Sequence, residues 1–217
     1  MALKRIAHYF PEWPSQTLEQ LEHLQRELLA WNEKINLISR KDTNAFEERH
    51  LLHCLALLKW FDFPKCAQIL DVGSGGGLPV LPLAIVRPDI QFTAVDSIQK
   101  KMRAVEAMRD ALGLENLLVE HGRMEKLNWL GDYVLARAVA PMPKLVGWTK
   151  DKIKSEAWEH PGVPPRGWVA LKGGDLTEEL QPFRRRVEVI ELSDRFESAF
   201  FERKKIIYLP KMVKQEA

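Results

Sequence analysis

The feature that most restricts the fold of this chain is a glycine-rich turn between a strand-like and a helix-like segment. Residues 67–72 are largely apolar, as in a buried strand, and glycines follow at positions 73, 75 and 77. Because glycine has no Cβ atom, the backbone there can turn sharply and a ligand can approach it closely. A strand, a glycine turn and a helix in this order form the context of a nucleotide-cofactor site.

An acid follows where such a site needs one. The next apolar segment, residues 90–95, ends in Asp96, which lies 19 residues after Gly77. A carboxylate in this place can accept hydrogen bonds from both ribose hydroxyls of a nucleoside. The turn and Asp96 together predict a site for a cofactor that contains a nucleoside.

The spacing of the glycines separates two cofactor classes. A dinucleotide fingerprint places its third glycine three residues after the second, where this chain has Leu78. The pattern Asp71-x-Gly73-x-Gly75-x-Gly77 instead resembles motif I of methyltransferases that use S-adenosylmethionine (SAM). The cationic sulfonium of SAM makes a nearby carboxylate such as Asp71 useful. A dinucleotide-dependent enzyme and a purely structural glycine turn remain as alternatives.

Strand-like segments alternate with helices through the rest of the chain. The expected strands span residues 67–72, 90–95, 117–120, 133–136, 168–171, 187–192 and 205–209. This alternation predicts an α/β fold with a mostly parallel seven-stranded sheet and helices on both faces. We expect the last two strands to pair as an antiparallel ribbon, because no long helix separates them.

The first part of the chain reads as helical. Leucines at spacings of three and four predict a helix over residues 15–35 with a capping box at Thr17, and Asn44 is expected to begin a second helix. Pro64 then separates this segment from the sheet. We therefore divide the chain into a helical N-terminal cap, residues 1–62, and a SAM-binding domain, residues 63–217.

Composition excludes several classes of protein. No stretch approaches the roughly 20 apolar residues of a membrane span, so no membrane is expected as a partner. The only two cysteines, Cys54 and Cys66, are interpreted as buried thiols and agree with a reducing, cytoplasmic location. The net charge of +2 is low for a protein that binds nucleic acid over its whole surface. No metal site is predicted, and nothing in the sequence requires more than a monomer.

The region after the fourth strand restricts the methyl acceptor. Enzymes that methylate exocyclic amines commonly carry an Asn/Asp-Pro-Pro-aromatic motif after the fourth strand. This chain has Ala136-Arg137-Ala138-Val139-Ala140-Pro141 there. Both cysteines precede the glycine turn, so neither is placed as the nucleophile that C5 methylation of a pyrimidine needs. An acceptor that is already nucleophilic, such as guanine N7, needs mainly proximity and alignment. No catalytic side chain is assigned.

The chain resembles a known family over roughly residues 15–175. The residues that carry the resemblance are, in order, Trp31-Asn32-x-x-Ile35-Asn36-Leu37, Glu48-Arg49-His50, residues 71–79, Val95-Asp96-Ser97, residues 122–125, Ala136-Arg137-Ala138 and Leu171-Lys172-Gly173. In this combination the sequence looks like the glucose-inhibited division protein B family. The resemblance implies a Rossmann-like fold of the class I SAM-dependent methyltransferase type, and a bacterial enzyme that methylates N7 of a guanine in 16S ribosomal RNA (rRNA), acting on the free rRNA or the 30S subunit. A SAM-dependent methyltransferase of another substrate and a non-catalytic module that binds SAM and the ribosome remain as alternatives.

The resemblance and the motifs together give the candidate site residues. The family pattern places the cofactor against Gly73, Leu78, Met124, Glu125 and Arg137, and the glycine turn and the second strand add Asp71, Gly75 and Asp96. The expected RNA contacts are Arg49, His50, Arg123, Arg137 and Lys172. Open candidates for phosphate contacts are Lys100, Lys101 and Arg103. The chain departs from the family at His53-Cys54, where an Asp-Ser pair is usual. The roles of the 155–166 loop and of the Arg184–Arg186 run stay open.

Overall fold

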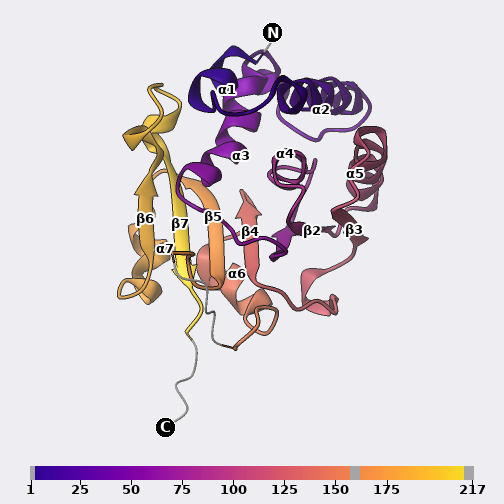
Figure 1. Ribbon diagram of the computed structural model, residues 1–217. Coiled ribbons are helices and arrows are strands. Elements are labelled where there is room, and N and C mark those ends of the chain that lie inside the picture. The colour runs from indigo at the N-terminus through magenta and orange to yellow at the C-terminus, as the bar shows by residue number, and fades with distance from the viewer. Residues whose placement is uncertain (1–2, 157–161, 213–217) are drawn as a thin grey trace.

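Seven strands form one mixed sheet in the computed structural model, which describes residues 3–156 and 162–212 (Figure 1). The order across the sheet is β3-β2-β1-β4-β5-β7-β6. The strands are β1 Gln68–Val72, β2 Gln91–Asp96, β3 Leu117–His121, β4 Tyr133–Arg137, β5 Gly167–Gly173, β6 Glu188–Glu191 and β7 Lys204–Pro210. The expected antiparallel pairing of the last two strands is confirmed, and β7 also runs antiparallel to β5.

Helices cover both faces of the sheet because its strands are apolar on both sides. One face packs against α4 Val80–Val86 and α5 Gln99–Leu112, and α2 Ser15–Lys34 packs in turn against these two helices. Helix α5 ends at Gly113, which is in the left-handed conformation. The other face packs against α6 Met142–Thr149 and α7 Thr177–Leu180. Figure 1 shows α2, α4 and α5 on the side of the sheet away from α6 and α7. No helix within residues 3–156 and 162–212 is both long enough and apolar enough to cross a membrane.

The N-terminal segment, residues 3–62, is less regular than its sequence predicts. After α1 Lys4–Tyr9, helix α2 buries Leu18, Leu21, Leu24 and Leu28 as expected. Pro14 stands at its N-cap position and no side chain caps it, so the capping box predicted at Thr17 is wrong. The second predicted helix is instead a series of a 3-10 turn Arg40–Ala45, a π-helix Glu47–Leu52, α3 His53–Leu55 and a 3-10 turn Ala56–Lys59.

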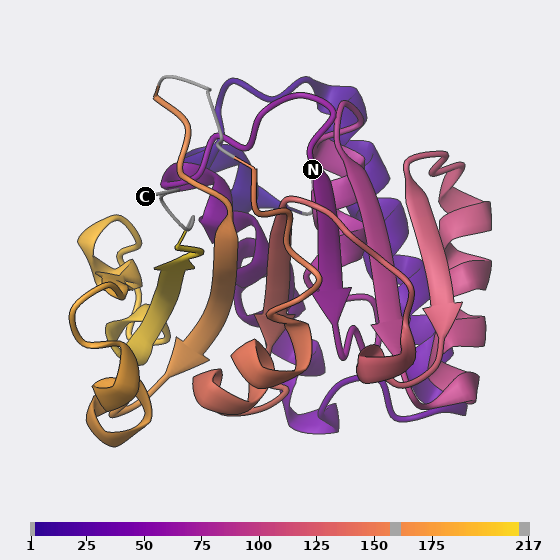
Figure 2. The same cartoon turned by 90° about the horizontal axis from the view of Figure 1, so that it is seen from below.

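The two ends of the strands form two edges with different structures. At the carboxyl edge, strands β1 to β5 end, and the start of β7 joins them because Lys204 pairs with Gly173. At the amino edge, Tyr133 and Tyr208 donate hydrogen bonds to the carbonyls of Pro164 and Pro165, which fixes the loop that leads into β5. Figure 2 shows this loop opposite the arrowheads of β1 to β5. The Arg184–Arg186 run precedes β6 at the same amino edge, and residues 157–161 lie outside the described part of the chain.

Candidate active site at the carboxyl edge

The glycine turn is attached to the end of the neighbouring strand by backbone hydrogen bonds. Gly73, Gly75 and Gly77 have φ values of +64°, +55° and +83°, which L side chains rarely adopt. The amides of Gly73 and Ser74 both donate to the carbonyl of Val95, at 2.8 and 3.1 Å. These bonds hold the turn over the carboxyl ends of β1 and β2.

Asp96 holds the same turn with its side chain. Its Oδ2 accepts a hydrogen bond from the Gly75 amide at 3.0 Å, and its Oδ1 accepts one from the Ile98 amide at 2.9 Å. A carboxylate oxygen can accept two hydrogen bonds, so each oxygen keeps capacity for a ligand hydroxyl. Asp96 therefore both shapes the turn and offers acceptors beside it.

A cavity of about 560 Å³ opens at the turn. This volume lies within the range of small-molecule sites, about 300–1,000 Å³. Its walls come from the N-terminal segment, the turn, the ends of β2, β3 and β4, and α6. They are formed by Leu37, Ile38, His50, Val72, Gly73, Ser74, Gly75, Gly76, Leu78, Val95, Asp96, Ser97, Lys101, Gly122, Arg123, Met124, Glu125, Arg137, Ala138, Val139 and Trp148.

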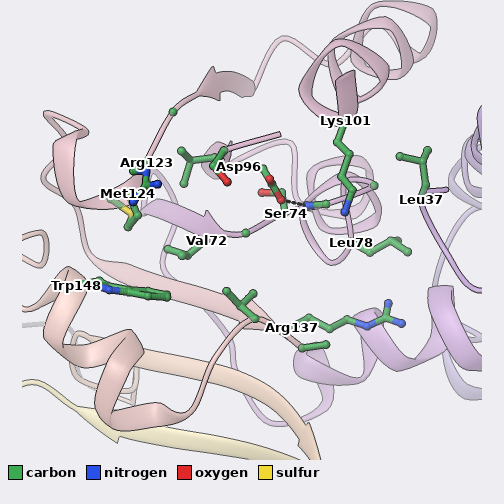
Figure 3. A pocket seen from close by; sticks show the side chains of 18 of the residues that line it. Leu37, Val72, Ser74, Leu78, Asp96, Lys101, Arg123, Met124, Arg137 and Trp148 are labelled. Carbon is green, nitrogen blue, oxygen red and sulfur yellow. Dashed lines mark hydrogen bonds between the residues drawn. The ribbon is translucent and has the colours of Figure 1, made fainter. Parts of the chain in front are cut away.

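The cavity brings together most of the residues that the sequence singles out. Seven of the eight predicted cofactor residues line it, the exception being Asp71, and so do three of the five predicted RNA contacts. Figure 3 shows Met124, Arg123 and Trp148 on one side of the view and Leu37, Leu78 and Arg137 on the other. Met124 and Trp148 on the first side offer apolar surface against which a nucleobase can lie. On the other side, the guanidinium of Arg137 stands beside the apolar side chains of Leu37 and Leu78.

Asp71 lies beneath the turn and does not line the cavity. The residue is completely buried, and neither carboxylate oxygen accepts a hydrogen bond of ordinary geometry from the described residues. Burial raises the pKa of Asp71 to about 7, and the nearby Ser74 hydroxyl, Val80 amide and Arg137 guanidinium offset only part of that effect. The sequence placed Asp71 near the sulfonium, whereas the structure places it in the floor that supports the turn.

Two predicted RNA contacts lie outside the cavity. The side chain of Arg49 is 44% exposed, pairs with Asp42 at 2.5 Å and lies 5.9 Å from the ring of Phe200. Lys172 is mostly buried, because its Nζ donates to the carbonyl of Ala140 at 2.5 Å and pairs with Glu179 at 2.9 Å. Arg49 is therefore accessible to a ligand at the surface, whereas Lys172 connects the end of β5 to α7 through its ion pair with Glu179.

Arg137 reaches from the end of β4 to the N-terminal segment. Its Nη1 donates to the thiol sulfur of Cys54 at 3.1 Å. Its Nη2 donates to the carbonyl of Arg49 at 3.2 Å and to Nδ1 of His50 at 2.8 Å. The next residue, Ala138, has φ +55°, an uncommon conformation for a residue with a Cβ atom, and also lines the cavity.

Several site residues were missed from the sequence. Leu37 and Ile38 come from the loop after α2, and Trp148 lies on α6; none of the three was among the predicted site residues. Lys204 was not among the predicted RNA contacts, yet it lies at the carboxyl edge, 4.8 Å from the Phe200 ring. Cys54 is buried as expected, but the prediction for Cys66 is wrong because that residue is exposed in the bend before β1.

Asn32 explains how the loop from the N-terminal segment forms a wall of the cavity. Its Oδ1 accepts hydrogen bonds from the amides of Leu37 and Ile38, at 2.9 and 3.0 Å. Leu37 then packs so closely on the turn that a Cβ atom added at Gly76 would lie 2.9 Å from the Cβ of Leu37. The Trp31-Asn32 motif was thus a usable signal for the loop that follows it.

Replacing Asn32 with alanine should loosen this wall. Two backbone amides would lose their acceptor, which costs about 1–3 kcal/mol of unfolding free energy. We expect a lower midpoint of thermal unfolding and weaker cofactor binding, measured by calorimetry. Asn128→Ala, at an exposed asparagine, is the control. Equal effects of the two substitutions would contradict a role for Asn32 in shaping the cavity.

Comparisons with known proteins agree with the resemblance drawn from the motifs. A family model described as rRNA small subunit methyltransferase G matches residues 17–208. A "Ribosomal RNA small subunit methyltransferase G" of Christiangramia forsetii is 43% identical over 97% of this chain and 98% of its own length. A protein of the same name from Flavobacterium johnsoniae is 42% identical over 96% of this chain and 98% of its own length.

Solved structures confirm the Rossmann-like methyltransferase fold. A SAM-dependent methyltransferase from Aquifex aeolicus superposes with a TM-score of 0.58 at 16% identity, over 81% of this chain and 100% of that one. A 16S rRNA N2 G1207 methyltransferase from T. thermophilus, solved with SAM and guanosine, gives 0.55 at 15% identity, over 76% of this chain and 43% of that one. The match to the family model and the identities above 40% over nearly the whole chain show the family. The chain belongs to the rRNA small subunit methyltransferase G family, and it is a SAM-dependent methyltransferase.

Proposed function

We propose that this enzyme transfers the methyl group of SAM to N7 of a guanine in 16S rRNA. The observation that carries the proposal is the cavity at the carboxyl edge, which combines a glycine turn, an acid with spare acceptor capacity and a rim of cations. Family membership supports rRNA of the small subunit as the substrate. The proposal includes action in the cytoplasm, by a monomer, on rRNA that is free or assembled in the 30S subunit.

The residues of the cavity fit SAM. Asp96 has acceptors for the ribose hydroxyls, while Val72, Val95 and the buried Met124 offer apolar surface to the adenine. Gly73 lets a ligand lie against the backbone, and Leu78 adds apolar contact. Glu125, which is exposed at the rim, is placed to accept a hydrogen bond from an exocyclic amine. When bound, SAM supplies an electrophilic methyl group on a cationic sulfur.

The chain's own contribution to the chemistry is then alignment of the acceptor. Guanine N7 carries no proton and has a lone pair in the plane of the ring, so its methylation requires no general base. Two ionisable groups along the cavity are already engaged by the protein: both oxygens of Asp96 accept from backbone amides, and Nδ1 of His50 accepts from Arg137. Holding the guanine in line with the methyl group is the main catalytic requirement.

Cations at the carboxyl edge are proposed to position the RNA backbone. Arg49 and Arg123 are accessible, Lys101 lines the cavity, and Arg203 and Lys204 stand at the start of β7. Figure 3 shows the amine of Lys101 directed toward the turn. Such contacts bind phosphates without reading sequence, and they weaken as salt increases.

Arg49→Ala should separate RNA binding from cofactor binding. The substitution removes an exposed guanidinium but leaves the Arg49 carbonyl that accepts from Arg137. We expect unchanged affinity for SAM, weaker binding to rRNA, and a salt dependence of that binding reduced by about one phosphate contact. Arg184→Ala, at the amino edge, is the matched control. A loss of SAM affinity in Arg49→Ala would contradict this assignment.

The direct test is methyl transfer to 16S rRNA and to 30S subunits from a strain that lacks the protein, followed by mapping of the modified base. We expect a single guanine that becomes sensitive to the strand-scission chemistry specific for 7-methylguanine. Methylation at the exocyclic N2 would overturn the proposed acceptor atom. Tight SAM binding without transfer to either substrate would overturn the proposed function.

A further inference from the structure

His50 was predicted to contact RNA, but the structure gives it a different partner. The residue is only 6% exposed, lies on the π-helix and has its Nδ1 2.8 Å from Nη2 of Arg137. Its ring also packs near Phe46, with 5.3 Å between the ring centroids. A side chain in this position is poorly placed to reach RNA directly, and it contacts a residue of the cavity rim instead.

The chemistry of this contact fixes the protonation state of His50. A guanidinium has five N–H donors and no acceptor, so Nδ1 of His50 must accept and the ring proton must be on Nε2. His50 is therefore a neutral imidazole in this arrangement. The pKa agrees, because burial lowers it to about 4, with Arg137 and Arg49 adding to the effect and Asp42 opposing it.

The same contact determines which donors of Arg137 remain for a ligand. Within the described residues, three of its five N–H groups bind Cys54, Arg49 and His50, all on the N-terminal segment. The remaining Nε–H and Nη1–H belong to a side chain that lines the cavity. Without an acceptor at position 50, the guanidinium would lose its shortest contact and could turn away from the cavity.

We propose that His50 is a positioning residue, a neutral imidazole that holds the guanidinium of Arg137 at the rim of the cavity. The expected effect of His50 on methyl transfer to rRNA rests on the proposed function, whereas its contact with Arg137 does not. His50 thereby links the N-terminal segment to the end of β4, across a sequence separation of 87 residues. Ala138, next to Arg137, has an uncommon backbone conformation that persists only where the surrounding contacts stabilise it.

Two substitutions of His50 separate the acceptor from the bulk of the ring. His50→Phe keeps a buried aromatic ring and removes the acceptor, whereas His50→Asn supplies an oxygen close to the position of Nδ1. We expect His50→Phe to lower the kcat of rRNA methylation by about 10- to 100-fold, as for a small misplacement of a site group. His50→Asn should recover most of that loss.

His53→Phe is the matched control for simple loss of a buried histidine. His53 is 5% exposed and packs against Phe200 and Phe201. It is not among the three groups that accept from Arg137 within the described part of the chain. We expect His53→Phe to lower the thermal midpoint about as much as His50→Phe while leaving kcat near that of the wild type. Equal kcat values for the two variants would overturn the proposal.

A second measurement decides the proposal even if rRNA is not the substrate. Long-range ¹H–¹⁵N NMR of the wild-type protein should show His50 with its proton on Nε2, and calorimetry should show weaker SAM binding in His50→Phe than in His50→Asn. A proton on Nδ1, or equal SAM affinities, would overturn the proposal. Failure of the wild type to methylate rRNA, with these two results as expected, would instead refute the proposed function.

Discussion

Replacing Asp96 with alanine is expected to reduce the affinity for SAM by about 100-fold or more. The carboxylate would no longer accept from the ribose hydroxyls, and each hydrogen bond to a charged group contributes about 1.5–3 kcal/mol. The same substitution would release the amides of Gly75 and Ile98, so the turn itself would lose an anchor. Both effects act on the same ligand and should appear together in a calorimetric titration.

Asp110→Ala provides the control for the loss of an acid from this part of the chain. Asp110 is exposed at the far end of α5, where it pairs with Arg109 at the surface. Its removal should leave SAM affinity unchanged and stability within about 1 kcal/mol, as for most surface ion pairs. A small effect of Asp96→Ala, comparable to that of Asp110→Ala, would show that the cofactor does not use this end of β2.

Gly73→Ala is expected to destabilise the protein by about 2–5 kcal/mol. The left-handed backbone, with φ +64°, costs an L residue about 1–2 kcal/mol. An added Cβ would also lie 2.8 Å from both Cγ atoms of Val139, and overpacking of this kind costs about 1–3 kcal/mol. Because Gly73 and Val139 both line the cavity, cofactor binding should fall as well. Thermal unfolding with and without SAM measures both effects.

Gly113→Ala measures the loss of stability that comes from the left-handed backbone alone, without overpacking. Gly113 has the same φ of +64°, but a Cβ atom there would meet nothing within 4 Å. We expect a loss of about 1–2 kcal/mol and unchanged SAM affinity. The double substitution Gly73→Ala with Val139→Ala should recover the steric part in Gly73→Ala. Similar losses in the two glycine variants, with no recovery, would show that the contact with Val139 is unimportant.

The sheet and the cofactor end of the cavity follow from short stretches of sequence. The positions of the glycine turn and of Asp96 were predictable because a local pattern dictates them: a strand, a sharp turn and an acid at the end of the next strand. The seven strands were recognisable from their apolar runs, and the apolar spacing in α2 gave the buried leucines. In each case, the deciding contacts lie within or beside one strand–helix unit.

The remaining parts of the site depend on contacts between distant segments. Arg137 was recognised as a site residue, but its partners on the N-terminal segment are 83 to 88 residues away in sequence. Lys172 is recognisable as a lysine at the end of a strand, yet only the fold shows that Glu179 and the Ala140 carbonyl engage it. A π-helix at 47–52 replaces the regular helix that was predicted. Within it, the carbonyl of Arg49 accepts a hydrogen bond from the side chain of Arg137. Such pairings are decided by tertiary packing.

The single reversed strand also determines where this protein can change its length. Along β7, Ile206 and Tyr208 pack on one face of the sheet, whereas Ile207 and Leu209 pack on the other. One residue inserted at the start of β7 would exchange these two sets and carry Lys204 off its partner Gly173. A residue inserted between Gly162 and Pro164 would instead lie before the two carbonyls that bind Tyr133 and Tyr208, at the amino edge and away from the cavity. A change of length is therefore expected to disturb the cavity less in that connection than at the start of β7.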